Sequence, residues 1–354
     1  MKRFTVYSTL PDGGNVGYGE PGWVNHAAGI YGFLQSGLQL QFERKTPGTA
    51  SYIVVDVMAG SYNAVMRLSF KYSDMVYCDI TEIVRCGISR TMTTAGSISA
   101  QGVAGTIVLT EYDSTDTAIG DTRIAGITFC DALALPYQPA SPFAPSYPDR
   151  LRMPSAAQYV SLEQVTVRAC SAYNSAAASV TVKRASGTTD YTQSLPNVSA
   201  PAQIGLKVTS AFVEVAGRSI RIERERCTSD KMFVTWWSSQ DGGYKSYLCD
   251  IVSKGGAIDS RTRYNAGFEF GDTVEASPSL TVRFPNLTAN DWQYCRDILY
   301  SGEVRVWDSE TTVPGSHAEL RGRRAVVSGD IGEWKPNEIK DFEIGLTFET
   351  VTVL

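Results

Sequence analysis

Histidine is nearly absent from this chain of 354 residues, which contains only His26 and His317. A Ser-His-Asp triad would need one of them to work with a nucleophile, and neither lies near a GxSxG motif. A zinc site with three histidines cannot be built from two. We therefore expect no catalytic residue, no metal ligands and no cofactor. A glycosidase-like pair of carboxylates is an alternative that the sequence leaves open.

Long apolar runs and clustered basic charge are also missing. No segment approaches the roughly 18 apolar residues that cross a bilayer, so we expect no membrane insertion. The net charge is −5, whereas nucleic-acid binding depends on clustered Lys and Arg, so we expect no nucleic-acid partner. The two short basic segments, residues 221–226 (RIERER) and 321–324 (RGRR), are interpreted as solvated faces.

The sequence also lacks paired cysteine motifs, and we do not expect its first residues to form a signal peptide. The seven cysteines form an odd set without a CxxC pair. Residues 1–14 (MKRFTVYSTLPDGG) begin with two basic residues but have no apolar stretch behind them. Together these features favour reduced, mostly buried thiols in a protein that is made in a cytoplasm.

Strand patterns dominate what is present. In residues 65–72 (VMRLSFKY), a period of two places Met66, Leu68, Phe70 and Tyr72 on one face. With 31 glycines and many Ser and Thr residues, the chain is predicted to be mostly antiparallel β. The same period recurs in residues 179–183, 280–284 and 342–348, and its phase shifts at Val351 and Val353, which predicts a bulge or the end of pairing.

Two short helices carry start signals. The first is predicted from Asp79 as N-cap, with Glu82 three residues later and Gly87 at its end. The second is predicted from Thr288 as N-cap, with Asp291 in the capping-box position. Its expected buried stripe consists of Trp292, Cys295 and Leu299. Neither helix is long enough to be stable alone, so each is expected to cover a sheet.

The proline-rich segment from 134 to 155 is the plainest domain boundary, because proline neither donates to a sheet nor continues a helix. We predict a mainly β fold of two to three antiparallel sandwich-like or barrel-like domains with short capping helices. The predicted division is an N-terminal β domain (1–135), a stiff linker (136–155), a small β domain or insertion (156–216) and a C-terminal β domain with a hairpin and one helix (217–354).

Two loops resemble ligand motifs only superficially. Residues 17–22 match GxGxxG, but a proline occupies the fifth position and no helical pattern follows, so a glycine-rich loop is favoured over a dinucleotide site. The acidic loop 111–121 could gather Ca²⁺ ligands from Asp113, Asp116 and Asp121, yet it lacks the order of an EF-hand loop. A hairpin turn is the favoured interpretation.

The aromatic segment 231–252 (KMFVTWWSSQDGGYKSYLCDIV) is the strongest candidate for a binding surface. The Asp-Gly-Gly turn predicts a hairpin. Adjacent residues of a strand point to opposite faces, so Trp236 and Trp237 cannot share one face. If one face is wet, at most one tryptophan is core, and the other is an exposed aromatic at a subunit interface or a glycan site. The candidate binding residues are Trp236, Trp237, Tyr244 and Tyr247.

Three segments, taken in order, resemble structural proteins of tailed phages and prophages from Bacteroides-like bacteria. They are residues 78–85 (CDITEIVR), the hairpin 234–247 and residues 287–304. The hairpin departs from that group at Trp237 and Lys245, and residues 156–216 have no clear counterpart. The resemblance implies a virion or tail-associated protein that works by assembly, and it implies no catalytic residues.

From this resemblance we expect a tail or tail-tip component, made in the bacterial cytoplasm without a signal peptide and assembled into the virion. Its expected partners are other virion proteins or further copies of itself. The alternative is a carbohydrate-binding or host-recognition module that uses exposed aromatics, with a surface glycan as its partner.

Overall fold

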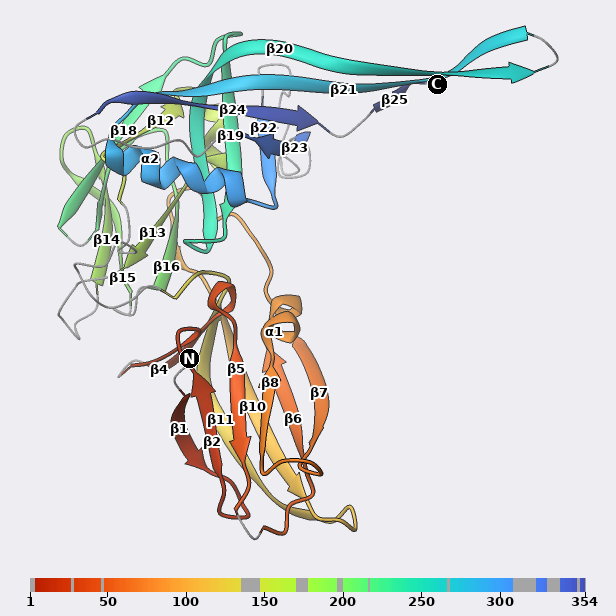
Figure 1. Cartoon of the computed structure of the whole chain (residues 1–354). Coiled ribbons are helices and arrows are strands. Elements are labelled where there is room, and N and C mark those ends of the chain that lie inside the picture. The colour runs from red at the N-terminus through yellow and green to blue at the C-terminus, as the bar shows by residue number, and fades with distance from the viewer. Residues whose placement is uncertain are drawn as a thin grey trace.

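The computed structural model describes residues 4–26, 29–45, 48–134, 147–169, 178–195, 200–215, 217–265, 268–307, 323–329, 338–348 and 351–353. The chain is mainly β, with several sheets, a closed six-stranded barrel and a few short helices, which confirms the predicted fold class (Figure 1). His317 and most of the proline-rich segment, residues 135–146, lie outside the described residues.

Two sheets form the N-terminal sandwich. The four-stranded sheet has the order β1 (Phe4–Thr9), β2 (Asn15–Gly19), β5 (Gln39–Glu43) and β8 (Met75–Asp79). The six-stranded sheet has the order β3 (Trp23–His26), β4 (Gly29–Phe33), β11 (Ala118–Cys130), β10 (Val103–Tyr112), β6 (Tyr52–Ala59) and β7 (Tyr62–Ser69). Alternate residues of both sheets, such as Leu40, Phe42, Val55 and Leu109, meet in one core.

The first helix, α1 (Thr81–Gly87), lies against β6 and β7 at one end of this sandwich. The predicted N-cap is wrong by one position, because Ile80 occupies it. Asp79 still serves the helix start, since its Oδ1 accepts a hydrogen bond from the Thr81 amide at 2.9 Å. Val84 is fully buried, so the helix covers the sheet as expected.

Two further sheets are formed mainly by the middle of the chain. The five-stranded sheet has the order β12 (Arg150–Pro154), β18 (Arg218–Glu225), β17 (Ser210–Val215), β14 (Ala178–Arg184) and β15 (Thr189–Leu195). The three-stranded sheet has the order β13 (Gln164–Ala169), β16 (Ala200–Gly205) and β9 (Ile98–Ala100). Short 3-10 helices are η1 (Leu34–Ser36), η2 (Ala157–Leu162) and η3 (Arg296–Tyr300).

The sheet topology differs from the predicted segment limits at three points. Residues 150–154, assigned to the linker, form β12, because Leu151 and Met153 alternate into the core beside β18. β17 and β18 form an antiparallel hairpin across the predicted limit at 216 and 217. β9 lies within the predicted N-terminal domain in the sequence, but it pairs with β16 of the three-stranded sheet.

The C-terminal strands form the barrel. Its members, in order around the ring, are β20 (Gly243–Asn265), β19 (Lys231–Ser238), β22 (Val304–Trp307), β23 (Arg323–Ser328), β24 (Lys340–Phe348) and β21 (Phe268–Leu287). Pairing of β20 with β21 closes the ring, so neither strand has a free edge where it lines the barrel. β25 (Val351–Val353) pairs with β21 outside the ring.

The predicted strand periods are mostly confirmed. Val180 and Val182, Val282 and Phe284, and Phe342, Ile344, Leu346 and Phe348 are buried at alternate positions. The phase shift after 348 falls between β24 and β25, which both pair with β21. Tyr72 is the exception: its side chain is 89% exposed, because β7 ends at Ser69.

The second helix, α2 (Ala289–Cys295), begins as predicted. Thr288 Oγ1 accepts a hydrogen bond from the Asp291 amide at 3.3 Å, and Asp291 Oδ2 accepts one from the Thr288 amide at 3.1 Å. This reciprocal pair is a capping box. Trp292 and Cys295 are buried.

The two superficial ligand motifs form turns. Residues 17–22 run from β2 into β3, without the helix that a dinucleotide site requires. Between β10 and β11, Asp113 Oδ1 accepts hydrogen bonds from the amides of Thr115 and Thr117 at 2.8 and 3.0 Å, as in a hairpin turn. Within the described residues, no cluster of three His, Cys, Asp or Glu side chains could hold a metal ion, and no helix could span a membrane.

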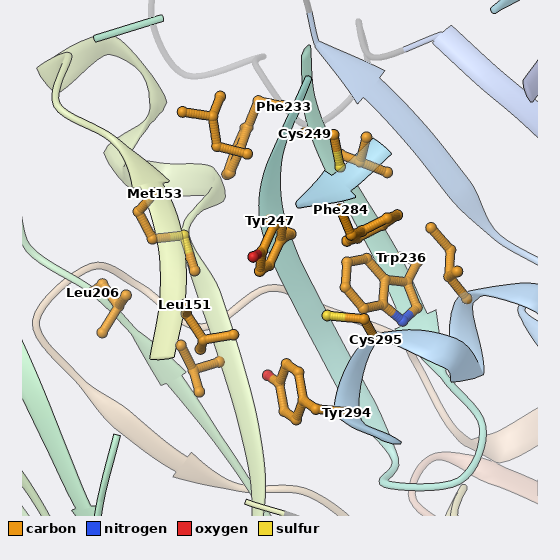
Figure 2. Close-up of a cluster of buried hydrophobic side chains, with 14 of the residues drawn as sticks. Leu151, Met153, Leu206, Phe233, Trp236, Tyr247, Cys249, Phe284, Tyr294 and Cys295 are labelled. Atoms are coloured by element: carbon orange, nitrogen blue, oxygen red, sulfur yellow. The ribbon is translucent and has the colours of Figure 1, made fainter. Parts of the chain in front are cut away.

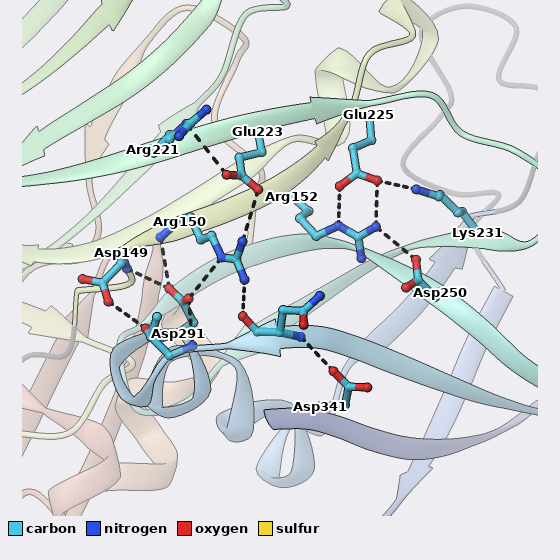
Figure 3. A network of polar contacts seen from close by, with 12 residues as sticks. Asp149, Arg150, Arg152, Arg221, Glu223, Glu225, Lys231, Asp250, Asp291 and Asp341 are labelled. Atoms are coloured by element: carbon cyan, nitrogen blue, oxygen red, sulfur yellow. Dashed lines mark hydrogen bonds and ion pairs between the residues drawn. The ribbon is translucent and has the colours of Figure 1, made fainter. Parts of the chain in front are cut away.

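The segment 221–226 was interpreted as a solvated face, and this is wrong for its inner residues (Figure 3). Arg152 of β12 binds both carboxylate oxygens of Glu225, at 2.6 and 2.7 Å, and reaches Asp250 of β20 at 3.0 Å. Arg224 Nη1 lies 2.5 Å from Glu163 Oε2. The contact of Arg152 with Asp250 ties the five-stranded sheet to the barrel, which the alternating charges alone did not reveal. Arg324, from the other basic segment, is exposed.

A buried carboxyl in the N-terminal core predicts a pH-dependent stability. Glu111 is fully buried in β10, its Oε2 accepts the Asp12 amide at 2.8 Å, and its Oε1 has no partner among the described residues. Burial raises the pKa of Glu111 from 4.5 to about 7. The folded state therefore holds this proton more tightly than the unfolded chain, and stability falls as the pH rises from about 4.5 to about 7.

We expect Glu111→Gln to match the parent chain in urea unfolding at pH 5 and to exceed it by roughly 1–3 kcal/mol at pH 8. Glu82→Gln, at an exposed position of α1, is the control and should show no such change. An equal effect of Glu111→Gln at both pH values would contradict this assignment.

Candidate functional site

The four predicted binding residues all lie in the hairpin of β19 and β20, and all are buried. Trp236 and Tyr247 are 0% exposed, Trp237 is 2% exposed and Tyr244 is 6% exposed. The expectation that one tryptophan would be exposed is therefore wrong. A glycan could stack only on an accessible ring, and none of the four offers one in this chain.

Trp236 and Tyr247 face the barrel core (Figure 2). The ring centroid of Phe284 lies 6.3 Å from that of Trp236 and 5.0 Å from that of Tyr247. Trp236 Nε1 donates a hydrogen bond to Asp297 Oδ1 at 2.7 Å. The hydrogen bond satisfies the one polar atom of the indole, so the ring can be fully buried at little cost.

Lys245 lies opposite Trp236 in the hairpin and is buried with it. Its Nζ is 2.6 Å from Asp241 Oδ2, 2.8 Å from Asp297 Oδ2 and 3.0 Å from the carbonyl oxygen of Tyr294. The ammonium also lies 3.9 Å from the centroid of the Tyr294 ring. One cation thus holds the turn of the hairpin and the 3-10 helix η3 together.

The charges of this cluster are coupled. Burial alone would lower the pKa of Lys245, but Asp241 and Asp297 raise it above its usual value. Burial raises the pKa of Asp297, and Lys245 offsets part of that rise. Ser238 Oγ also donates to Asp297, so each polar group of the cluster has a partner. The cluster is buried and fixes the hairpin against η3.

Trp237 faces the other way, toward the N-terminal sandwich. Its ring packs edge-on against Tyr244, with centroids 5.1 Å apart, and the Arg90 guanidinium lies 5.0 Å from its centroid. Arg90 also binds Asp131, at 2.9 Å. The two tryptophans do point to opposite faces of the hairpin, as predicted. The outer face, however, is covered by other parts of the protein and not by solvent. The partner that Trp237 requires is Arg90 of its own chain.

Arg168 also links the hairpin turn to the N-terminal part of the chain. Its side chain is almost fully buried and donates to the carbonyl oxygens of Gln240 and Leu133 at 3.0 and 2.8 Å. Its guanidinium lies 5.3 Å from the Phe33 ring centroid. Arg90, Arg168, Lys245 and Asp297 were all missed in the sequence, because most of their partners are distant in the chain; only Asp241, four residues before Lys245, is a local one.

A two-stranded ribbon leaves the barrel beside this hairpin (Figure 1). The pairing of β20 with β21 runs from Asp250 opposite Arg283 to Asn265 opposite Phe268. β19 accompanies β20 only as far as Asp250, and β24 accompanies β21 only from Ser279 onward. The outer part of β20, residues 252–265, spans about 45 Å at the usual rise per residue of a strand.

The two edges of the ribbon differ in how much of each is paired with a further strand. β25 pairs with β21 at residues 274–276. In the part of the chain that the structure describes, residues 252–265 of β20 have no strand on the side away from β21. An isolated two-stranded hairpin is only marginally stable in water, and an open edge offers unpaired N–H and C=O groups. Among the described residues, the outer part of β20 is therefore a long strand edge that is open to pairing with another strand.

No model of a known protein family matches the chain, and no curated protein matches it. Its function is therefore inferred from its own residues and geometry.

The buried cluster predicts a large effect of removing its cation. Lys245→Met leaves Asp241 and Asp297 without a counter-charge, so we expect a loss of about 3–5 kcal/mol in the free energy of unfolding at pH 7. The loss should shrink toward low pH, because burial raises the pKa of Asp297, so that this carboxyl then takes up a proton. Lys254→Met, at the exposed root of the ribbon, is the control. Unchanged stability of Lys245→Met at pH 7 would rule out the ionised cluster.

The contact of Arg90 with Trp237 can be isolated by a double-mutant cycle of Arg90→Ala and Trp237→Leu. Each single change also removes other contacts, such as the ion pair with Asp131. The cycle cancels those losses and should leave a coupling of about 1 kcal/mol. Urea unfolding of the four chains measures it, and additive losses would mean that the cation–π contact contributes nothing.

Proposed function

We propose that this chain is a structural protein of a tailed phage or prophage virion, in the tail or tail tip, that acts by assembling with other proteins. The observation that carries the proposal is the ribbon of β20 and β21. A strand edge of this length is completed when another chain adds a strand to it. The phage setting is supported by the sequence resemblance in residues 78–85, 234–247 and 287–304.

The rest of the chain suits a part that holds the ribbon in a defined direction. The ribbon continues two strands of a closed barrel, so its root is fixed by hydrogen bonds on both sides. The barrel is tied to the N-terminal sandwich through Trp237 and Arg90, and to the five-stranded sheet through Arg152. A stiff body lowers the entropy cost of binding, because little of it must be ordered at the moment of association.

The buried polar clusters support assembly over catalysis. The Lys245 cluster and the Arg152 network hold parts of the chain together through ion pairs between their own residues. Assembly in a virion also fits synthesis in the bacterial cytoplasm, with other tail proteins or further copies of this chain as partners.

The test is the protein content of particles induced from a bacterial strain that carries the gene. The parent chain should be present in purified particles at a constant ratio to the other tail proteins, as measured by mass spectrometry. A ribbon-less variant replaces residues 257–277 by Asn-Gly and so joins Gly256 to Pro278, which face each other in the ribbon. It should keep the circular dichroism of the barrel and be lost from the particles.

Ser186→Ala, in the turn between β14 and β15, is the matched control and should enter particles like the parent. Absence of the parent chain from particles that contain the other tail proteins would overturn the proposal. Normal incorporation of the folded ribbon-less variant would show that the ribbon is not the assembling element.

A further inference from the structure

We infer that the ribbon pairs with the ribbon of a second copy of this chain, through the open edges of the two β20 strands, which run antiparallel about a twofold axis. This inference rests on the proposed function, since it names the partner of the same ribbon. It predicts a dimer held together by a four-stranded ribbon in the order β21-β20-β20-β21.

Among the described residues, the outer edge of β20 has no neighbouring strand, and of the features that block edges it lacks proline, while it carries four charged residues and a register shift between Arg261 and Thr262. Residues 252–265 contain no proline, whereas Pro278 lies on β21. Proteins protect an edge with proline because it removes an N–H donor. Val252 is 42% exposed at the root of this edge, and the two glycines that follow at 255 and 256 allow close approach of another backbone.

The direction of pairing follows from the barrel. Every strand pair of the barrel sheet is antiparallel, and β19 is the antiparallel neighbour of β20 up to Asp250. A strand that takes the place of β19 along the ribbon continues this pattern if it also runs antiparallel to β20. The β20 strand of a second copy meets this condition, because a twofold axis reverses its direction.

Length favours a second copy over the other strand edges of the chain. The edge strands β7 and β15 contain 8 and 7 residues. They would cover only about 25 Å of an edge that spans about 45 Å. Another β20 edge has the full length. An antiparallel pair of identical strands keeps its hydrogen-bond pattern when the strands are exchanged, which makes this edge complementary to itself.

The proposed dimer leaves room for the barrels of both copies. In an antiparallel pair the roots of the two ribbons lie at opposite ends, so the barrels are separated by about the length of one ribbon. The interface then consists mainly of backbone hydrogen bonds, as in other cases of strand addition.

The first measurement is the mass in solution by light scattering after size-exclusion chromatography. The chain has a mass of 38.5 kDa. The parent should elute with twice this mass, and the ribbon-less variant with the mass of one chain and an unchanged melting temperature. A parent chain that stays monomeric at high concentration would overturn the inference.

The second measurement locates the axis by a cysteine scan of residues 252–265 in a Cys86→Ser background, since Cys86 is an exposed free thiol. About a twofold axis, one position of β20 lies opposite its own copy. Disulfide-linked dimers should therefore peak at one position and fall on both sides of it, while Ser186→Cys, distant from the ribbon, should form none.

A dimer without such a peak would overturn pairing of the two β20 edges. A monomeric parent whose ribbon-less variant is nevertheless lost from particles would mean that the ribbon binds a different virion protein, so that the proposed function stands without this inference. A monomeric parent whose ribbon-less variant enters particles normally would remove both.

Discussion

The hydrogen-bonded pairing of β20 with β21 is the constraint on which the rest of this structure depends. Near the barrel it closes the ring of six strands and encloses the core around Trp236, Tyr247 and Phe284. Beyond the barrel the same two strands continue as the ribbon. One pairing therefore both closes the C-terminal barrel and forms the ribbon that we propose binds a partner.

Buried charges define how the parts of the chain meet. Lys245 joins the hairpin turn to η3, Arg168 joins the hairpin turn to the segment after β11, and Arg152 joins β12 to β20. Removing such groups from water is costly, and a buried ion pair is weak evidence for stability by itself. Its directional contacts are satisfied in one arrangement only. We therefore regard these groups as fixing the orientation of the barrel, and with it the direction of the ribbon.

The sequence predicts local features of this chain and misses the distant ones. The periods of two in β14, β21 and β24 and the capping box at Thr288 are local, because neighbouring residues decide them. The β12 strand was missed because the prolines of the surrounding segment, residues 134–155, obscured the alternation of Leu151 and Met153. The exposure of a tryptophan was wrongly expected because the outer face of the hairpin is covered by residues distant in sequence, Arg90 among them. The ribbon was missed because the length of β20 and β21 beyond the barrel depends on their pairing with each other. Local sequence patterns do not show such a pairing.

Amide hydrogen exchange of the ribbon tests the central claim most directly. In a single chain, the N–H groups of residues 252–265 that point away from β21 face no other strand of the described part of the chain, so they should exchange quickly. In the assembled protein we expect slow exchange along this edge, comparable to β20 inside the barrel. Equally fast exchange of these amides before and after assembly would contradict a ribbon that works by strand addition.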